Sequence, residues 1–254
     1  MNVHALFGQS IEPCLVFPAI EAHRVQLNLI PSALAECSTL GTLAPRGWPV
    51  TFYGNQLLPR LQDKAMDRKP IRALRARVCA GLRGEVVEVG FGTGLNAPHY
   101  PPALAKVWAI EPSALCMRIA QPRIAQSSTA VELAGLDGRH IDLPSASLDA
   151  ALSTWTLCTI PDLATALTEL RRLLKPGGSF HFVEHGHAPD ANVAGWQRRL
   201  EPLTKRLAGG CHLTRRIPET IERAGFVIEQ LHSYYVEGEP QVFAYTFEGR
   251  AKNP

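Results

Sequence analysis

The chain has 254 residues, of which 46% are hydrophobic and 19% are charged, and its formal net charge is +3. A chain of this length can bury roughly 75% of the surface that its unfolded form exposes. So high a hydrophobic content with so small a net charge excludes a disordered polymer. Basic residues are spread along the chain with acidic residues between them, so we expect no nucleic-acid partner.

The apolar runs and the cysteines bear on the compartment. The longest apolar runs, such as residues 14–20, fall well short of the ~20 residues that a membrane-spanning helix needs. The first residues lack the basic and apolar regions of a secretory signal. Six cysteines stand far apart with no C-x-x-C pair, which is typical of free thiols in a reducing compartment. The sequence therefore predicts a cytoplasmic protein without a transmembrane segment.

Residues 1–47 differ from the rest of the chain. They mix apolar residues with proline and glycine and show no sustained helical or strand period. Two interpretations stay open: a weakly ordered extension, which includes the case of a start codon assigned too early, and a lid. Residues 48–254 are expected to form the folded domain. It begins with two amphipathic helices between Gln56 and Leu82, interrupted at Pro70.

Strands and helices alternate after Gly84. Short β-branched runs predict strands, and the runs with leucine-type spacing between them predict helices. The predicted strands are 85–89, 107–110, 131–134, 148–157 and 179–184, and the predicted helices include 113–125 and 162–174. This alternation predicts an α/β fold with a Rossmann-like, mostly parallel sheet and helices on both faces.

The last seventy residues predict a different arrangement. Residues 186–214 are polar and loop-rich, and we expect an insertion there that covers an edge of the sheet. A predicted helix over 217–224 is followed by a strand that runs to Tyr235 and by a last strand over 241–247. Because the turn between these two strands is so short, they must be antiparallel.

Three glycines give the first functional signal. Gly90, Gly92 and Gly94 follow a predicted strand, where residues without a Cβ atom permit a tight turn and a close approach of ligand to backbone. Leu95 stands where a dinucleotide fingerprint needs its third glycine, and no P-loop lysine follows, so NAD and ATP are disfavoured. Glu111 comes about twenty residues later, where a carboxylate can accept both ribose hydroxyls. We therefore predict a nucleoside ligand; a tight turn beside a surface glutamate is the alternative.

Four motifs in order resemble a known family. They occupy residues 86–94, 110–113, 143–149 and 173–178. They resemble the motifs of class I S-adenosylmethionine-dependent methyltransferases, most closely the branch with ubiquinone-biosynthesis-type and alkyl-thiol methyltransferases. The resemblance covers about residues 52–250. It implies a seven-stranded sheet with an antiparallel last strand, and S-adenosylmethionine as the cofactor.

The resemblance also implies which residues bind the cofactor. The three glycines would lie against its methionine and ribose portions, Glu111 on the ribose hydroxyls and Asp137 on the adenine amino group. The full implied set is Tyr53, Glu88, Gly90, Phe91, Gly92, Thr93, Gly94, Asn96, Glu111, Pro112, Ser113, Asp137, Gly138, Thr154 and Trp155. Arg139 stands where many relatives carry glutamate, and residues 54–56 depart from the family pattern after Tyr53. The resemblance therefore leaves the adenine edge and the lid contacts open.

His185 is the candidate catalytic residue. Methyl transfer from a sulfonium mainly requires alignment and exclusion of water, but a thiol with an ordinary pKa near ~8.5 must first lose its proton. His185 follows the fifth predicted strand, at the carboxyl edge where α/β sites form, and can favour the thiolate. A histidine that only hydrogen-bonds a loop is the alternative.

The other histidines and cysteines receive structural interpretations. His185, His187, Cys211 and His212 match no standard metal spacing, so we expect no metal site. Cys158 and Cys211 are interpreted as buried packing residues.

The leading functional prediction is methyl transfer to a small, lipophilic acceptor, with a thiol favoured. An amine, phospholipid headgroup, phenol or quinol acceptor stays open, as do a nicotinamide-dependent oxidoreductase and a sensor that binds S-adenosylmethionine without turnover. Basic pairs such as Arg198–Arg199 allow a weak contact with a phospholipid surface, although a solvated helical face explains them as well. The sequence gives no prediction for the oligomeric state.

Overall fold

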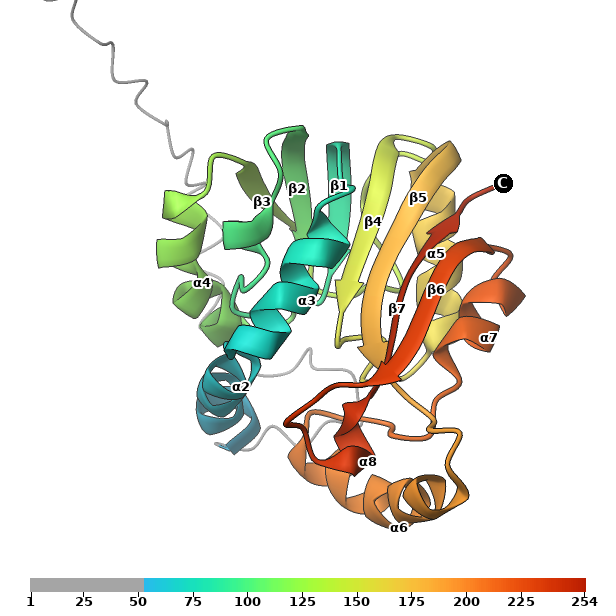
Figure 1. The fold of residues 1–254 in the computed structure, drawn as a ribbon. Coiled ribbons are helices and arrows are strands. Elements are labelled where there is room, and N and C mark those ends of the chain that lie inside the picture. The colour runs from blue at the N-terminus through green and yellow to red at the C-terminus, as the bar shows by residue number, and fades with distance from the viewer. Residues whose placement is uncertain (1–52) are drawn as a thin grey trace, which may run out of the picture. The chain divides into compact units, whose positions relative to one another are not determined.

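The computed structural model describes residues 53–254, and the expectations for residues 1–47 lie outside these residues. The described chain forms one seven-stranded sheet with helices on both faces (Figure 1). Within residues 53–254, none of the helices combines the length and the apolar character that crossing a membrane requires.

The strand order of the sheet is β3-β2-β1-β4-β5-β7-β6. The first five strands pair in parallel, whereas β7 is antiparallel to both β5 and β6. The strands are β1 Gly84–Val89, β2 Leu104–Ile110, β3 Ala130–Gly135, β4 Leu148–Thr154, β5 Leu174–His185, β6 Val227–Tyr235 and β7 Tyr245–Lys252. The predicted fold class is therefore confirmed, including the antiparallel last strand.

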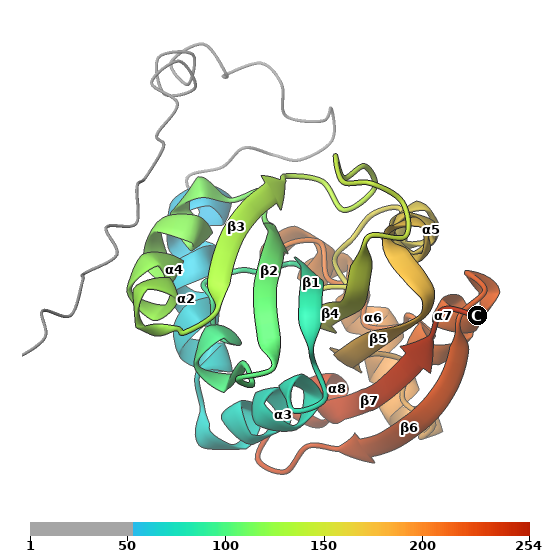
Figure 2. The same ribbon diagram turned by 90° about the horizontal axis from the view of Figure 1, so that it is seen from above.

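The helices form two layers and a group at one edge of the sheet. Helices α3 and α4 cover one face, and α5 and α7 cover the other (Figure 2). The helical elements are η3 Tyr53–Leu57, α2 Leu58–Met66, α3 Lys69–Cys79, η4 Ala97–His99, α4 Ala114–Gln126, α5 Leu163–Leu173, α6 Ala191–Leu207, α7 Ile217–Arg223 and α8 Gln241–Ala244.

The alternation of side chains along β1 separates two hydrophobic cores. Val87 and Val89 pack with the leucines of α5, including Leu167, whereas Val86 packs with Leu74 of α3. Successive strand residues point to opposite faces, so Glu88 lies on the same face as Val86. A carboxyl group is thereby placed on the α3 side of the sheet, at the end of a buried strand.

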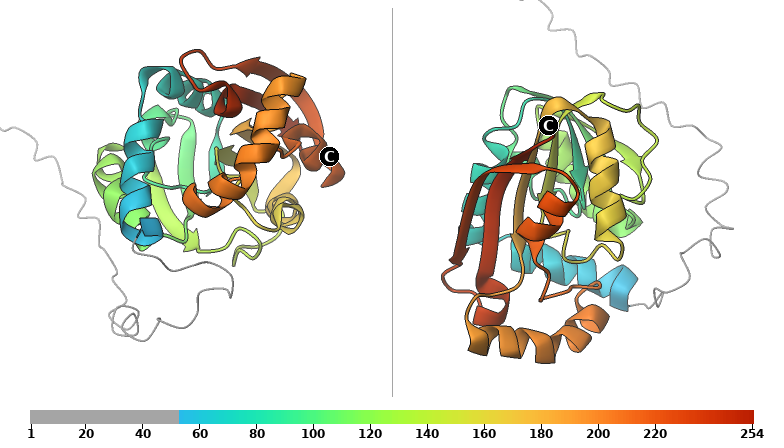
Figure 3. Two further views of the ribbon diagram at one scale, coloured as in Figure 1. Left: turned by 90° about the horizontal axis from the view of Figure 1, so that it is seen from below. Right: turned by 90° about the vertical axis from the view of Figure 1, so that its right-hand side faces the viewer.

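The carboxyl ends of the parallel strands meet at one edge, which is where ligand sites form in α/β sheets. Helices α2, α6 and α8 lie beside this edge, at the bottom of the view in Figure 1 and in the right-hand view of Figure 3. The hydroxyl of Tyr53 donates a hydrogen bond to the Leu207 carbonyl of α6 at 2.9 Å. The helical segment that begins the described chain therefore contacts α6 beside the edge.

The loop-rich structure predicted for residues 186–214 is wrong for most of the segment, because α6 occupies residues 191–207. The Asp190 side chain begins this helix by accepting from the backbone N–H of Val193 at 3.0 Å. Gln197 is 1% exposed, accepts from the Ala188 backbone N–H and donates to the Gly186 carbonyl. A polar residue on the buried side of the helix concealed its apolar face from the sequence pattern.

Two predicted strands are wrong in their bounds. Residues 241–244 form α8, so β7 begins at Tyr245 rather than at residue 241. Strand β4 ends at Thr154 instead of continuing to residue 157. Trp155 has a φ of 50°, a left-handed conformation that an extended strand cannot contain.

Candidate active site

The glycine turn after β1 is the first part of the site. Gly90, Gly92 and Gly94 all have a left-handed backbone, with φ values of 75°, 59° and 75°. A Cβ atom on Gly90 would lie 2.0 Å from Oγ1 of Thr156, whereas one on Gly92 would meet only the Gly90 carbonyl oxygen at 3.8 Å. The backbone at Gly92 is therefore the part of the turn that a ligand can approach closely.

Glu111, directly after β2, holds the turn from the side. Its Oε2 accepts from the Gly92 backbone N–H and its Oε1 from the Ser113 backbone N–H, both at 2.8 Å. Burial raises the pKa of Glu111 even though these hydrogen bonds oppose the shift. A carboxylate oxygen can accept two hydrogen bonds, so each oxygen retains a lone pair for a ribose hydroxyl.

Glu88 is the buried carboxyl group of the site. It is 1% exposed, and it accepts from Nδ2 of Asn96 at 2.9 Å and from the hydroxyl of Tyr100 at 2.5 Å. Burial raises the pKa of Glu88 to about 7, against the opposing effect of these hydrogen bonds and of the Arg75 charge. A cationic group of a ligand would favour the ionised form of this carboxyl.

Arg75 of α3 is a site residue that sequence reasoning missed. It is 6% exposed, and Nη1 donates to Oδ1 of Asn96 at 2.8 Å and to Oγ1 of Thr154 at 2.9 Å. Its guanidinium lies over the ring of Trp155, 5.0 Å from the ring centre. Its Nε is buried without a hydrogen-bond partner among the described residues. This cation can bind a ligand carboxylate, and an arginine within the apolar stripe of α3 was its only sequence signal.

Asp137, the residue predicted at the adenine edge, is engaged by its neighbour. Its carboxylate accepts from the Arg139 backbone N–H at 2.9 Å and from the guanidinium at 2.6 to 3.1 Å. These hydrogen bonds lower the pKa of Asp137. A Cβ atom on Gly138 would lie 3.1 Å from Val89. An adenine amino group would have to share the Asp137 carboxylate with Arg139 or displace the Arg139 guanidinium from it. The arginine that departs from the family pattern therefore competes for the residue predicted to bind adenine.

Most of the remaining predicted cofactor residues surround the same turn. Phe91 is buried in the core on the α3 side, and the carbonyl of Thr93 accepts a hydrogen bond within the turn region. Pro112 is exposed next to Glu111, and the Ser113 hydroxyl caps α4. Tyr53 instead directs its hydroxyl to α6.

One arginine joins α2 to the glycine turn. Arg123 of α4 donates to the Thr93 carbonyl at 2.8 Å and forms an ion pair with Asp63 of α2 at 2.8 Å. The side chains of the ion pair are 22% and 20% exposed, so solvent screens it only in part. The position of α2 is therefore coupled to the turn.

Glu184 of β5 fixes the segment that follows β4. It is fully buried, and its Oε1 accepts from the Ser153 hydroxyl at 2.8 Å and from the backbone N–H groups of Thr156 and Leu157 at 3.0 and 3.1 Å. These three hydrogen bonds hold the backbone around Trp155, including its left-handed φ.

Two sulfur atoms and one imidazole meet at the ends of β4 and β5. Nε2 of His185 lies 3.1 Å from Sγ of Cys158 and 3.2 Å from Sγ of Cys211, and all three side chains are buried. Burial alone would lower the pKa of His185, but the adjacent Cys211 sulfur and Glu184 raise it overall. Hydrogen bonding by Cys158 and His185 lowers the pKa of Cys211 against its burial. The cluster therefore favours a thiolate at Cys211.

The interpretation of the two cysteines as packing residues is incomplete. They pack with Leu213, as predicted for core residues, but their sulfur atoms also contact His185. His212 is not part of the cluster, since its Nδ1 lies 3.7 Å from a carboxylate oxygen of Glu201. The cluster joins three segments that lie far apart in the sequence, which is why residue spacing did not indicate it.

Two surface hollows lie outside this constellation. One, of about 410 Å³, is lined by His187, Tyr245 and other residues near the β5 and β7 ends. The other, of about 290 Å³, lies beside Tyr100 and Arg123. Neither is lined by the glycine turn or by the Cys158–His185–Cys211 cluster.

Comparison with known proteins identifies the family. Residues 87–182 match the family model described as a methyltransferase domain. The chain is 33% identical over 178 residues to thiol S-methyltransferase TMT1B of Homo sapiens, and the match covers 67% of this chain and 72% of the human protein. The chain belongs to the S-adenosylmethionine-dependent methyltransferase family.

A second relative of this methyltransferase is thiol S-methyltransferase TMT1B of Rattus norvegicus, at 36% identity over 159 residues. That match covers 59% of this methyltransferase and 64% of the rat protein, slightly less than two thirds of its length. A solved S-adenosylmethionine-dependent methyltransferase from Thermotoga maritima has a TM-score of 0.59 at 20% identity, covering 80% of this chain and all of that chain. At that identity the likeness concerns the fold alone. The predicted family and fold are confirmed, and the family implies the use of S-adenosylmethionine.

Proposed function

We propose that this methyltransferase transfers the methyl group of S-adenosylmethionine to the sulfur of a small, lipophilic thiol. The observation that carries the proposal is the buried cluster of Cys158, His185 and Cys211 at the carboxyl ends of β4 and β5. The human and rat relatives, both named thiol S-methyltransferases, support the same acceptor class.

The cofactor is proposed to lie across the glycine turn. Because there is open space at Gly92, a ligand can approach the backbone there closely. Glu111 offers free lone pairs to the ribose hydroxyls. Glu88 and Arg75 carry opposite charges on the α3 side of the turn, which suits the ammonium and the carboxylate of the methionine portion. Of the other residues of the implied set, Thr154 and Trp155 both contact Arg75 in this region.

The reaction requires a thiolate acceptor in a dry, aligned position. The acceptor sulfur attacks the methyl carbon, the bond from that carbon to the sulfonium sulfur breaks, and its electron pair stays on that sulfur. The thiol proton leaves to solvent beforehand, and His185 favours the thiolate. Phe243, whose ring centre lies 6.4 Å from that of His185, and Trp155 supply apolar surface for a lipophilic acceptor.

The cytoplasm is our proposal for the compartment. Among the described residues, Cys79, Cys116, Cys158 and Cys211 are free cysteines. Free thiols persist in a reducing environment, so the cysteine chemistry of the site supports this location.

Substitution of His185 tests the acceptor class. Initial rates are compared for an alkyl thiol, a phenol and an amine in the wild type and in His185→Ala. We expect the thiol to be the preferred acceptor and His185→Ala to lower kcat/KM for the thiol by about 100-fold, while the dissociation constant for the cofactor changes little. His187→Ala, two residues away and outside the cluster, is the matched control. A wild-type preference for phenol or amine, or an unchanged thiol rate in His185→Ala, would contradict the proposal.

A further inference from the structure

Three side chains of the kinds that bind metal ions lie close together, and methyl transfer itself does not require such a group. Sγ of Cys158, Nε2 of His185 and Sγ of Cys211 all lie within 4.8 Å of one another. They are the one such group of His, Cys, Asp and Glu side chains found among residues 53–254. Nε2 lies at hydrogen-bond distance from both sulfur atoms, yet a ring nitrogen carries at most one proton to share between them.

The distances suit a tetrahedral metal ion. Bonds of about 2.3 Å to sulfur and about 2.0 Å to nitrogen place tetrahedral sulfur and nitrogen ligands about 3.5 Å apart. The two observed separations are 3.1 and 3.2 Å, so outward shifts of about 0.3 to 0.4 Å bring both nitrogen–sulfur separations to this value. Thiolate and imidazole are donors that zinc prefers over the harder divalent ions.

Hydrogen bonds hold the backbone at the two cysteine donors in place. The backbone N–H of His212 donates to the Cys158 carbonyl at 2.9 Å, and the Thr204 hydroxyl donates to the Cys211 carbonyl at 2.9 Å. Arg215 donates to the Leu157 carbonyl, next to Cys158, and so brings a positive charge to the sulfur atoms. Such outer contacts orient the ligands of metal sites.

We propose that Cys158, His185 and Cys211 bind one zinc ion, and that a fourth coordination position takes the sulfur of the acceptor thiol. Three protein ligands with one exchangeable position are the arrangement of catalytic zinc sites, whereas structural sites have four protein ligands. The role of the fourth position rests on the proposed thiol acceptor, but the binding of zinc does not.

The zinc site adjoins the cofactor region. Sγ of Cys158 lies 3.9 Å from the Trp155 carbonyl oxygen, and the ring of Trp155 lies beside Arg75. Gly90 of the glycine turn packs so closely against Thr156 that a Cβ atom would not fit between them. The segment that contains Trp155, Thr156 and Cys158 therefore connects the proposed zinc site with the glycine turn.

The ion supplies the activation of the acceptor. A thiol that coordinates zinc is deprotonated, and its proton passes to solvent as the thiol replaces a water molecule. The bound thiolate then attacks the methyl carbon, and the sulfonium sulfur keeps the electron pair of the broken bond. The product thioether is neutral and has no proton to lose, so it binds zinc more weakly and leaves. His185 thus favours the acceptor thiolate indirectly, because it helps to bind the ion that deprotonates the thiol.

Metal content tests the zinc site without any methyl donor or acceptor. The full chain is purified under reducing, anaerobic conditions, supplied with zinc, desalted and analysed for bound metal. We expect one zinc ion per chain in the wild type and in the control Cys79→Ala, whose sulfur is buried in the core on the α3 side of the sheet. We expect Cys158→Ser, Cys211→Ser and His185→Ala to lose it. A wild type that retains no more zinc than the double variant Cys158→Ser/Cys211→Ser would overturn the proposal.

Cobalt substitution of the wild type keeps the test valid if a variant fails to fold. Bound Co²⁺ should show sulfur-to-cobalt charge transfer and the strong visible absorption of a tetrahedral site, and an added alkyl thiol should increase the charge-transfer band. Absence of these bands, or a Cys158–Cys211 disulfide in protein kept reduced, would contradict the site. A spectrum that does not change when thiol is added would contradict the proposal that the fourth coordination position takes the acceptor sulfur. Stoichiometric zinc and a thiol-sensitive spectrum without methyl transfer to thiols would uphold the site and contradict the proposed function alone.

Discussion

Gly90 and Gly92 differ in what an added methyl group would meet. A Cβ atom at Gly90 would lie 2.0 Å from Thr156, so we expect Gly90→Ala to lower the free energy of unfolding by about 2 kcal/mol or more. At Gly92 the added atom enters open space, with only the strain of a positive φ, about 1 kcal/mol. Gly92→Ala should therefore fold and yet bind S-adenosylmethionine more weakly. Thermal unfolding and calorimetric titration measure both effects; unchanged cofactor affinity in Gly92→Ala would contradict the account.

Glu88 gives the cofactor-free protein a pH dependence of stability. Burial raises the pKa of Glu88 from 4.5 to about 7, so between these pH values the folded state binds a proton that the unfolded state releases. The free energy of unfolding contributed by Glu88 therefore falls as the pH rises from 5 to 7. Glu88→Gln removes this contribution. The stability difference, wild type minus variant, should decrease by at most about 1.4 kcal/mol per pH unit in this window.

Urea unfolding at several pH values between 5 and 8 measures the effect of Glu88. The difference between the two proteins is the quantity to follow, because His181 acts in the opposite direction. Burial lowers the pKa of His181 to about 4, so its contribution to stability is lost as the pH falls from 6.5 toward 4. A stability difference that does not change with pH would show that Glu88 titrates normally in the folded protein.

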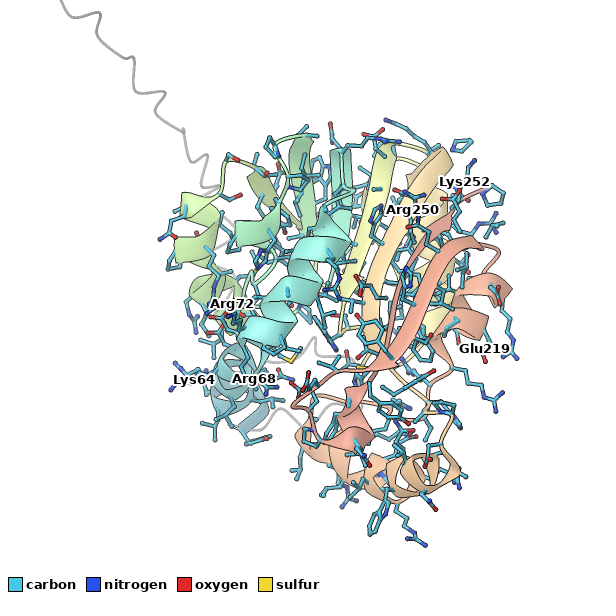
Figure 4. All side chains as sticks on the ribbon, in the orientation of Figure 1. Lys64, Arg68, Arg72, Glu219, Arg250 and Lys252 are labelled. Carbon is cyan, nitrogen blue, oxygen red and sulfur yellow. The ribbon has the colours of Figure 1, made fainter. Side chains whose placement is uncertain are left out.

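At the level of elements, Arg123 couples three parts of the site. It joins α4, the Thr93 carbonyl and Asp63 of α2. We expect Arg123→Ala to weaken cofactor binding by about tenfold, because a charge-assisted hydrogen bond to the turn is lost with the ion pair. Lys64→Ala is the matched control, since Lys64 is an exposed residue of α2 next to Asp63 (Figure 4). Equal cofactor affinities of the two variants, measured by titration, would contradict the coupling.

The elements of the sheet were predictable because their patterns are local. Strands β1, β2 and β4 read as β-branched or apolar runs, since both of their faces are buried against helices. Helix α6 was not predictable in this way, because its buried side includes Gln197. Nor was the four-residue α8, which is too short to show a helical period.

The residues of the site also differ in whether a local sequence pattern indicates them. The glycine turn and Glu111 belong to motifs whose residues are near one another in the sequence, so the sequence could indicate both, and the structure brings them into contact. Arg75 meets Thr154 across 79 positions, and His185 meets Cys158 and Cys211 across 27 and 26. These contacts arise only when α3, β4, β5 and the loop after α6 meet at the carboxyl edge. Composition and spacing carry no signal for such an assembly.

On the scale of the whole molecule, every residue assigned to the site lies within residues 53–254. A truncated protein of residues 48–254 should therefore bind S-adenosylmethionine within about twofold of the full chain, a change well below the 1.4 kcal/mol of a tenfold effect. Calorimetric titration of both proteins checks this. Loss of cofactor binding would contradict it, and the methyl-transfer rate of the truncated protein would distinguish a lid, which predicts a fall, from an extension, which predicts none.

The central claim is methyl transfer to a thiol, and transfer of a labelled methyl group tests it most directly. The purified full chain is incubated with labelled S-adenosylmethionine and a panel of small thiols, amines, phenols and quinols, with Gly92→Asp as the control that closes the cofactor site. The account predicts label in the thiol products of the wild type and none in those of Gly92→Asp. Label only in another acceptor, or cofactor binding with no label in any acceptor, would contradict it.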